Sequence, residues 1–229
     1  MCTKHLQNIF AVTLLMAGTT FSNVGQANIL NIDNFTHLQS VVDRGDTIGA
    51  TTNTIINLTG TDLTNASRTF IAEATADKYA NKKDIVSGGN LLKISNTAGS
   101  SGSASVMWNF DPIDFTSYGN AILLEFVAID LDVNVQMIAN GTSSSVINSF
   151  SGPGNYLVNF NDFSNSSAFT SVSSFRLDFN GPLAWDGQFR LLATTNSVPI
   201  PSAFFLMGSA LLSCIGISCR KKQSSITAI

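Results

Sequence analysis

Hydrophobic and polar side chains alternate along several short runs in the middle of the chain. In the first clear run, Val106, Trp108 and Phe110 alternate with Met107 and Asn109. The same period of two returns at residues 133–137, 156–160 and 175–179. Successive side chains of a β-strand point to opposite faces of the sheet, so each run predicts a half-buried strand.

Residues 121–129 (AILLEFVAI) form a different pattern, because nearly every side chain is apolar. Such a run predicts either a central strand packed on both faces or a short helix, and its β-branched and aromatic content favours the strand. Weaker strand candidates lie at residues 54–58, 68–75 and 91–95. No stretch of the middle region predicts a helix convincingly.

Turn-forming residues separate these runs. Stretches rich in Gly, Asn, Ser and Pro occur at residues 87–90, 98–102, 140–141, 152–154 and 180–182. Asn140-Gly141 lies between two candidate strands, 135–139 and 146–150, and predicts a hairpin. About ten short strands with frequent turns predict an all-β fold, an antiparallel β-sandwich or jelly roll.

The first residues have the order of a signal peptide. Lys4 and His5 precede an apolar run at residues 9–17, which is too short to span a bilayer. Small residues then follow, and Ala27 closes the segment Val24-Gly25-Gln26-Ala27. We therefore expect cleavage after Ala27. The alternative interpretation is a buried N-terminal helix.

The C-terminal end combines a proline motif, an apolar run and a basic cluster. The run at residues 203–219 extends roughly 26 Å as a helix, just enough to cross a bilayer, and the basic cluster after it places the C-terminus in the cytoplasm. The flanking residues are Val198, Pro199, Ile200 and Pro201 before the run and Arg220, Lys221 and Lys222 after it. The chain thus divides into a signal peptide (1–27), a β-sandwich ectodomain (28–196), a tail (197–222) with a single transmembrane helix (203–219) and a cytoplasmic end (223–229).

This order of elements resembles the PEP-CTERM sorting signal, also called the ice-binding-protein C-terminal domain. Ile200 stands where the family usually has Glu, so the motif is closer to the Val-Pro-Leu-Pro-Ala variant. The resemblance implies a Gram-negative or cyanobacterial host and transient anchoring in the inner membrane. It also implies cleavage by an exosortase-type protease and transfer to the cell surface or the extracellular matrix, often beside exopolysaccharide. The alternative is a permanent single-pass anchor.

The middle of the chain is also similar to jelly-roll ectodomains that often precede this tail. The motifs that carry this resemblance are Asp33-Asn34-Phe35-Thr36, Gly88-Gly89-Asn90-Leu91, Trp108-Asn109-Phe110-Asp111, Ser174-Phe175-Arg176-Leu177-Asp178-Phe179 and Trp185-Asp186-Gly187. They imply the fold and assign no activity.

Composition excludes several classes of function for the ectodomain. It holds fifteen acidic and eight basic residues, a net charge of about −7, which argues against nucleic acid as a partner. All cysteines lie outside it, at Cys2, Cys214 and Cys219, which excludes disulfides, thiolate catalysis and cysteine-ligated zinc. His37 is its single histidine, so a multi-histidine metal site is excluded too.

Two places suit the binding of a sugar, which needs a flat apolar ring beside hydrogen-bonding groups. Trp185 lies next to Asp186, and Tyr118 lies close to Asn120, each beside a glycine. The alternative interpretation for Trp185 is a side chain that fills the end of the core, because Trp is usually buried.

Calcium is the one cofactor that the composition allows, as a structural ion. Carboxylates supply the oxygen ligands that Ca²⁺ prefers, and Asp111, Asp114, Asp130 and Asp132 would serve if they converge at one end of the sandwich. No EF-hand spacing is present. The alternative is that these side chains cap turns.

No catalytic residue is assigned. A glycoside hydrolase needs two carboxylates across a cleft, and the only glutamates, Glu73 and Glu125, lie inside candidate strands without a local motif. The leading hypothesis is therefore a non-enzymatic surface or matrix protein of structural or adhesive role. A module that binds carbohydrate such as exopolysaccharide is the second hypothesis, and a hydrolase with paired carboxylates is the third.

Overall fold

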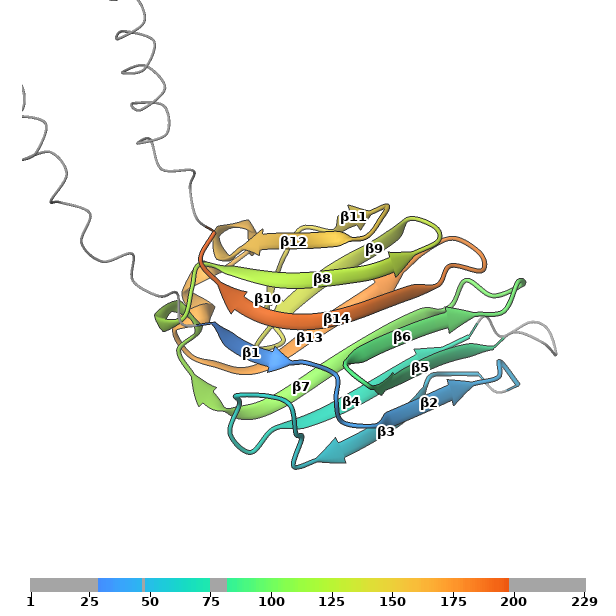
Figure 1. Cartoon of the computed structure of the whole chain (residues 1–229), viewed down its shortest axis with the longest axis horizontal. Helices are drawn as coiled ribbons and strands as arrows, with labels where there is room; N and C mark the ends of the chain where they lie inside the picture. The colour runs from blue at the N-terminus through green and yellow to red at the C-terminus, as the bar shows by residue number, and fades with distance from the viewer. Residues whose placement is uncertain (1–28, 47, 75–81, 198–229) are drawn as a thin grey trace, which may run out of the picture.

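The computed structural model describes residues 29–46, 48–74 and 82–197, which form a sandwich of two antiparallel sheets (Figure 1). The front sheet, which faces the viewer in Figure 1, has the order β12 (Gly154–Asn159), β8 (Ala121–Ile129), β14 (Gly187–Thr195), β6 (Leu91–Asn96), β5 (Lys83–Gly88) and β2 (Gln39–Asp43), with β1 (Leu30–Asp33) paired to β14. The back sheet has the order β10 (Ser143–Ser144), β9 (Val133–Ala139), β13 (Val172–Asn180), β7 (Ser103–Ile113), β4 (Ser67–Glu73) and β3 (Thr51–Ile56), with β11 (Asn148–Phe150) paired to β9. Short 3₁₀ helices η1 (Phe115–Ser117), η2 (Phe160–Asp162) and η3 (Ser166–Thr170) connect strands at one end.

The predicted all-β antiparallel sandwich is confirmed. From β7 onward the longer strands alternate between the two sheets, with β7, β9 and β13 in the back sheet and β8, β12 and β14 in the front sheet. Such alternation is the connectivity of a jelly roll. Because the longer strands alternate between the two sheets, β9 and β13 are neighbours in the back sheet although β10, β11 and β12 separate them in sequence.

The runs with a period of two lie in strands, except that β12 ends at Asn159 and Phe160 begins η2. Residues 121–129 form a strand, β8, rather than a helix. The hairpin at Asn140-Gly141 is confirmed as well, since Ala139 pairs with Ser143 and both turn residues have positive φ, 52° and 68°. Asn and Gly tolerate this left-handed conformation, which matches the twist of the flanking strands.

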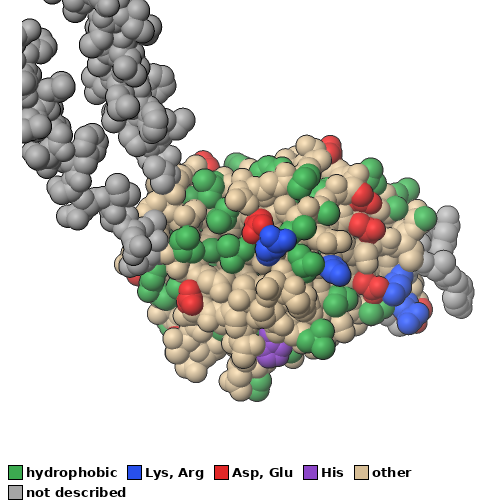
Figure 2. Space-filling view, viewed as in Figure 1, with side chains coloured by type: hydrophobic (Ala, Val, Ile, Leu, Met, Phe, Trp, Pro, Cys, Tyr) green, Lys and Arg blue, Asp and Glu red, His purple; other side chains and the backbone are tan. Residues whose placement is uncertain are grey.

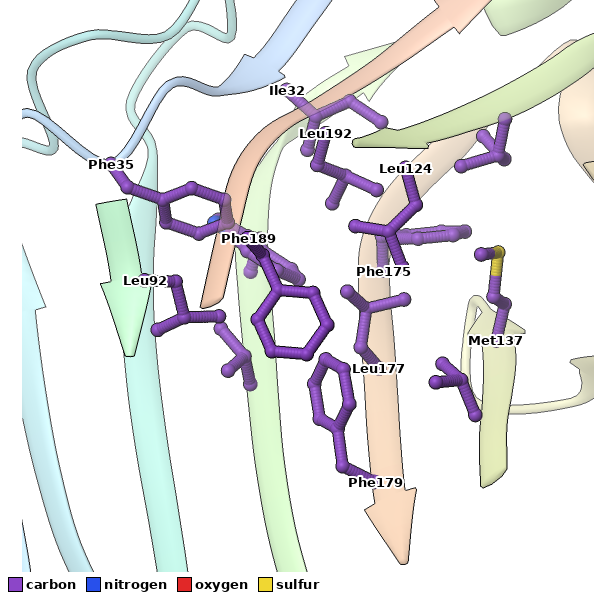
Figure 3. Close-up of a cluster of buried hydrophobic side chains, with 14 of the residues drawn as sticks. Ile32, Phe35, Leu92, Leu124, Met137, Phe175, Leu177, Phe179, Phe189 and Leu192 are labelled. Carbon is purple, nitrogen blue, oxygen red and sulfur yellow. The ribbon is translucent and has the colours of Figure 1, made fainter. Parts of the chain in front are cut away.

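Aromatic and aliphatic side chains from both sheets fill the space between them (Figure 3). Phe179 of β13 and Phe189 of β14 meet across the sandwich with ring centroids 4.9 Å apart, and Phe126 of β8 lies 4.7 Å from Phe189. Burying each such side chain contributes about 1.5–3 kcal/mol. Leu30 of β1 pairs with Thr194 of β14, so the two ends of the described sandwich lie side by side, and its buried core cluster runs from Leu30 to Leu192.

A buried ion pair lies inside this apolar core. The Arg68 guanidinium donates to Asp33 Oδ2 at 2.5 Å, and both side chains are fully buried. The indole Nε1–H of Trp108 donates to the same Oδ2 at 2.8 Å, while Gln39 and Ser87 accept from Arg68. Burial raises the pKa of Asp33, and the adjacent Arg68 charge opposes that shift. The network ties β1, β2, β4, β5 and β7 together.

Both terminal predictions lie outside the described residues. They comprise the signal peptide (1–27), the motif at Val198, Pro199, Ile200 and Pro201, the transmembrane helix (203–219) and the basic cluster at Arg220, Lys221 and Lys222. Within the part of the chain that the structure describes, no helix has the length and hydrophobicity needed to cross a membrane.

Candidate functional site

A groove of about 390 Å³ crosses the outward side of the back sheet. It lies over the neighbouring strands β7, β13 and β9, whose inward side chains fill the core. The outward positions that line it are mainly polar: Ser103, Ser105, Asn134, Gln136, Arg176, Asp178 and Asn180, with Ala104 and Ile147 completing the lining.

The charged side chains of this groove neutralise one another. Arg176 donates to Asp178 Oδ2 through Nε (3.1 Å) and Nη2 (2.7 Å), a two-point contact. The other carboxylate oxygen of Asp178 accepts from the Ser105 hydroxyl at 2.7 Å. With the guanidinium paired and the carboxylate satisfied, the groove presents little net charge to a ligand.

Two exposed asparagine side chains lie at one end of the groove. Asn134 of β9 and Asn180 of β13 lie opposite each other in the register of the two strands, and both side chains are exposed. Neither amide has a hydrogen-bond partner among the described residues. Each carboxamide offers two N–H donors and one acceptor oxygen, so this Asn134/Asn180 pair can serve a ligand that both donates and accepts.

The end of the groove rests on a buried tryptophan. Trp185, predicted as a sugar-stacking ring, is fully buried, and its ring lies against Gly181, where an added Cβ would approach it to 2.6 Å. The expectation that Trp185 offers its face to a sugar is thus corrected, and its role as a core-filling side chain is confirmed. Its neighbour Asp186 accepts a backbone hydrogen bond from Asn96 at 2.8 Å.

Lys83 lies beneath this tryptophan. Its Nζ is 4.3 Å from the centroid of the Trp185 ring and donates to the carbonyl of Gly102 at 2.6 Å. Burial lowers the pKa of Lys83 to about 7, and the charge of Asp186 offsets part of that shift. Gly102 precedes Ser103, and Gly181 follows Asn180, so Lys83 and Trp185 support the same end of the groove that holds the Asn134/Asn180 pair.

The second predicted sugar site lies at the opposite end of the sandwich. Tyr118 is half-buried against the core, and Asn120 lines a second groove of about 600 Å³. The carboxamide oxygen of Asn120 already accepts from the backbone N–H of Ser197 at 2.6 Å and from its hydroxyl at 2.9 Å. No exposed ring completes this site, because every aromatic side chain among the described residues is buried or half-buried.

The predicted convergence of four aspartates is wrong. Asp111 ends the regular part of β7 and accepts from Asn65, and Asp114 caps η1. Hydrogen bonds from Thr116 and Ser117 lower the pKa of Asp114. These two lie before β8, whose nine residues span roughly 30 Å.

The other two aspartates follow β8 at its far end, where Asp130 accepts from the backbone N–H of Asp186 and Asp132 lies in the same turn. The strand therefore separates the two pairs of carboxylates. The described residues contain no group of three or more metal-ligating side chains. Three of the four carboxylates cap turns or loops, as the alternative interpretation holds.

The two glutamates lie on opposite outer surfaces. Glu73 ends β4 in the back sheet and accepts from Ser103 at 3.3 Å, while Glu125 in the front sheet pairs with Arg190 at 3.3 Å. A full sandwich lies between them, so Glu73 and Glu125 do not form an acid and base pair across one cleft.

The sequence pattern did not identify the groove residues as a site. Asn134 and Gln136 alternate with buried valines, and Arg176 and Asp178 alternate with buried phenylalanine and leucine. What the sequence did not disclose is the pairing of β9 with β13, which brings these outward side chains together.

The chain was compared with family models, curated proteins and solved structures. No protein-family model and no curated protein matches the chain. The solution structure of CtCBM11 aligns with a TM-score of 0.40 and 13% identity over 77% of this chain and 100% of that chain. The family 11 carbohydrate-binding module of cellulosomal cellulase Lic26A-Cel5E of Clostridium thermocellum gives 0.40 and 12% over 76% of this chain and 99% of that chain. PfGH50B gives 0.38 and 7%, with 66% of this chain and 23% of that chain covered. Such values concern the layout of strands, and no conclusion about a ligand rests on them.

Proposed function

We propose that this chain is an exported, non-enzymatic surface protein whose sandwich binds polysaccharide in the groove on the back sheet. The observation that carries the proposal is the exposed Asn134/Asn180 pair, two unoccupied carboxamides within a polar groove. Sugar hydroxyls donate and accept hydrogen bonds, as carboxamides do, so two adjacent carboxamides match two neighbouring hydroxyls.

The charge balance of the groove favours an uncharged glycan. Arg176 is paired with Asp178 in a two-point contact, so the lining of the groove offers no unpaired Lys or Arg to a uronate or a phosphate. Nucleic acid is disfavoured by the same reasoning, since phosphate recognition needs unpaired Lys or Arg. Because no aromatic ring is among the residues that line this groove, hydrogen bonds supply the affinity, and we expect dissociation constants from about 0.1 mM to several mM.

The location of the protein belongs to the same proposal. A signal peptide with cleavage after Ala27 would deliver the sandwich to the outside, and the tail at residues 197–222 would present it to an exosortase-type protease. A glycan-binding domain released or held there would contact exopolysaccharide. Mass spectrometry of the mature protein tests this part, because recovery from membranes alone with residues 203–229 intact would establish a permanent anchor instead.

Binding is tested with residues 28–197, whose core is complete. A glycan array followed by titration calorimetry should find an uncharged polysaccharide that binds the wild-type segment. The double substitution Asn134→Ala/Asn180→Ala should weaken that binding by about 10-fold, since each lost hydrogen bond is worth about 0.5–1.5 kcal/mol.

The control is Asn155→Ala, which removes an exposed carboxamide from β12 in the front sheet and should leave the affinity unchanged. A loss with Asn161→Ala, which lines the second groove, would instead place binding at the other end of the sandwich. Binding that survives the double substitution would overturn the assignment of the groove, and turnover of the polysaccharide would overturn the non-enzymatic role.

A further inference from the structure

The outward side of the front sheet is rich in aliphatic side chains. Leu38 is 75% exposed, Leu157 46% and Val42 37%, and five more are partly exposed. We call this surface the aliphatic face: Leu38, Val42, Val86, Leu91, Leu123, Val127, Leu157 and Leu191. Figure 2 looks onto it and shows hydrophobic side chains spread across the sheet. A sheet that faces water on one side normally places polar side chains there, so this composition favours a surface that becomes covered.

The back sheet provides the contrast. Its outward strand positions carry mainly Ser, Thr, Asn and Gln, with four larger apolar side chains scattered among them: Ile56, Ile71, Met107 and Ile138. Ile147, which follows β10 and lines the groove, adds a fifth. The two outer surfaces of one sandwich therefore differ in chemistry, and a ligand-binding role for the polar surface leaves the aliphatic face unexplained.

The aliphatic face is also nearly neutral in an acidic domain. Arg190 pairs with Glu125 near its middle, and Lys82 pairs with Asp84 at 2.5 Å near one end, while Lys93 adds one positive charge. Residues 28–197 as a whole carry about −7. Two copies of this domain repel each other least when they approach through this face.

We propose that the aliphatic face binds a second copy of this chain in a two-fold, face-to-face contact. Such a contact is self-complementary, because each apolar side chain meets the same surface and Arg190 of one copy can approach Glu125 of the other. Six strands and about six residues per strand give the face a projected area of roughly 500 Å². This is below the about 800 Å² per partner of a standard interface, so the dimer should be of micromolar affinity.

Sedimentation velocity of residues 28–197 between about 1 µM and 200 µM tests the proposal. We expect a concentration-dependent dimer that Arg190→Glu weakens by at least about 10-fold. The substitution places a second carboxylate beside Glu125 in each copy, and these two carboxylates then face the same two in the other copy. The double substitution Glu125→Arg/Arg190→Glu exchanges the charges and should restore the dimer. Arg176→Glu makes the same change of net charge on the back sheet and serves as the matched control.

Cross-linking gives an independent readout, because residues 28–197 contain no cysteine. A single Leu191→Cys should form a disulfide-linked dimer under mild oxidation, whereas Thr69→Cys on the outward side of β4 should not. A segment that stays monomeric at 200 µM would overturn the proposal. So would a dimer that Arg176→Glu disrupts and Arg190→Glu leaves intact. A monomeric segment leaves the proposed glycan binding untouched, because that binding uses the opposite sheet. A dimer that Arg176→Glu disrupts would instead form over the groove itself, and glycan competition with that dimer would show it.

Discussion

Two buried cations of the sandwich have opposite surroundings. Arg68 has a carboxylate partner, Asp33, at 2.5 Å, and it also donates to Gln39, Ser87 and the carbonyl of His37. Lys83 is equally buried, but among the described residues it has a single hydrogen bond, to the carbonyl of Gly102, together with a contact to the face of Trp185. The difference shows two ways in which this fold accommodates a buried basic side chain. The charge of Arg68 is paired with a carboxylate, whereas the pKa of Lys83 is lowered, so that this side chain loses its proton more easily.

The physical cost explains the two outcomes. Moving an ion from water into a protein interior is unfavourable by several kcal/mol unless a counter-charge and hydrogen bonds replace the lost water. Arg68 receives both. Lys83 has one carbonyl, one ring and the charge of Asp186 nearby, which together do not offset its loss of water, and burial lowers its pKa to about 7.

The two regions also differ in what they support. The Arg68 network joins five strands in the interior, whereas Lys83 and Trp185 support the backbone at Gly102 and Gly181, next to the proposed glycan-binding groove. Changes at Arg68 should therefore act on the whole fold, and changes at Lys83 should act on one end of the groove.

The largest expected effect follows from breaking the paired region. Arg68→Met should lower the free energy of unfolding by about 3–5 kcal/mol, because it leaves the Asp33 carboxylate buried without its counter-charge. Urea denaturation of residues 28–197, followed by tryptophan fluorescence, measures the loss. Trp108 donates to Asp33, so the fluorescence also reports directly on this site.

A double substitution distinguishes the missing charge from the missing volume. Asp33→Leu/Arg68→Met removes both charges and should recover part of the lost stability, as replacing a buried pair by apolar groups often does. If the double variant is less stable than Arg68→Met alone, then the hydrogen bonds to Trp108 and Gln39, and not the unpaired charge, dominate the network.

A medium-sized effect on the free energy of unfolding should follow from replacing Lys83. Lys83 has a folded pKa of about 7 against 10.5 for an ordinary lysine. Between these values the unfolded chain binds the proton and the folded chain does not, so stability should rise with pH by about 1.4 kcal/mol per unit. Below about pH 7 both states are protonated, and this contribution becomes constant.

The measurement is the difference in unfolding free energy between wild type and Lys83→Met at several pH values. Because other groups titrate identically in both proteins, the difference isolates Lys83. From pH 7.5 to 9.5 the wild type should gain about 2–3 kcal/mol relative to the variant. A difference that is independent of pH would show that Lys83 stays charged beneath Trp185.

The sequence predicted features that depend on neighbouring residues, and it did not predict contacts between residues far apart along the chain. Strands and turns depend on neighbouring residues, so the alternation at Phe175 and Leu177 and the turn at Asn140-Gly141 were sufficient. The motifs that begin at Asp33 and Trp108 were noted separately, but nothing local shows that the Trp108 indole donates a hydrogen bond to the Asp33 carboxylate. That contact spans 75 residues.

The candidate site shows the same limit. Trp185 was correctly considered as a core-filling residue, but the lysine beneath it comes from β5, about a hundred residues earlier. The groove depends on the pairing of β9 with β13, and polar outward residues give no signal of which strands are neighbours. The four aspartates were grouped because they are close in sequence, and the length of β8 separates them.

The smallest effect is expected at the residue next to Lys83 in the chain. Lys82 has an acidic partner, Asp84, at 2.5 Å, but its side chain is 39% exposed, and water already solvates both charges. An exposed pair of this kind contributes at most about 1 kcal/mol. Lys82→Met should therefore change the unfolding free energy by less than about 1 kcal/mol. Measured beside Lys83→Met, the same substitution one position away compares an exposed lysine with a buried one, because side-chain type and net charge are matched. A change of clearly more than about 1 kcal/mol with Lys82→Met would show that the exposed pair with Asp84 contributes more than solvent screening allows.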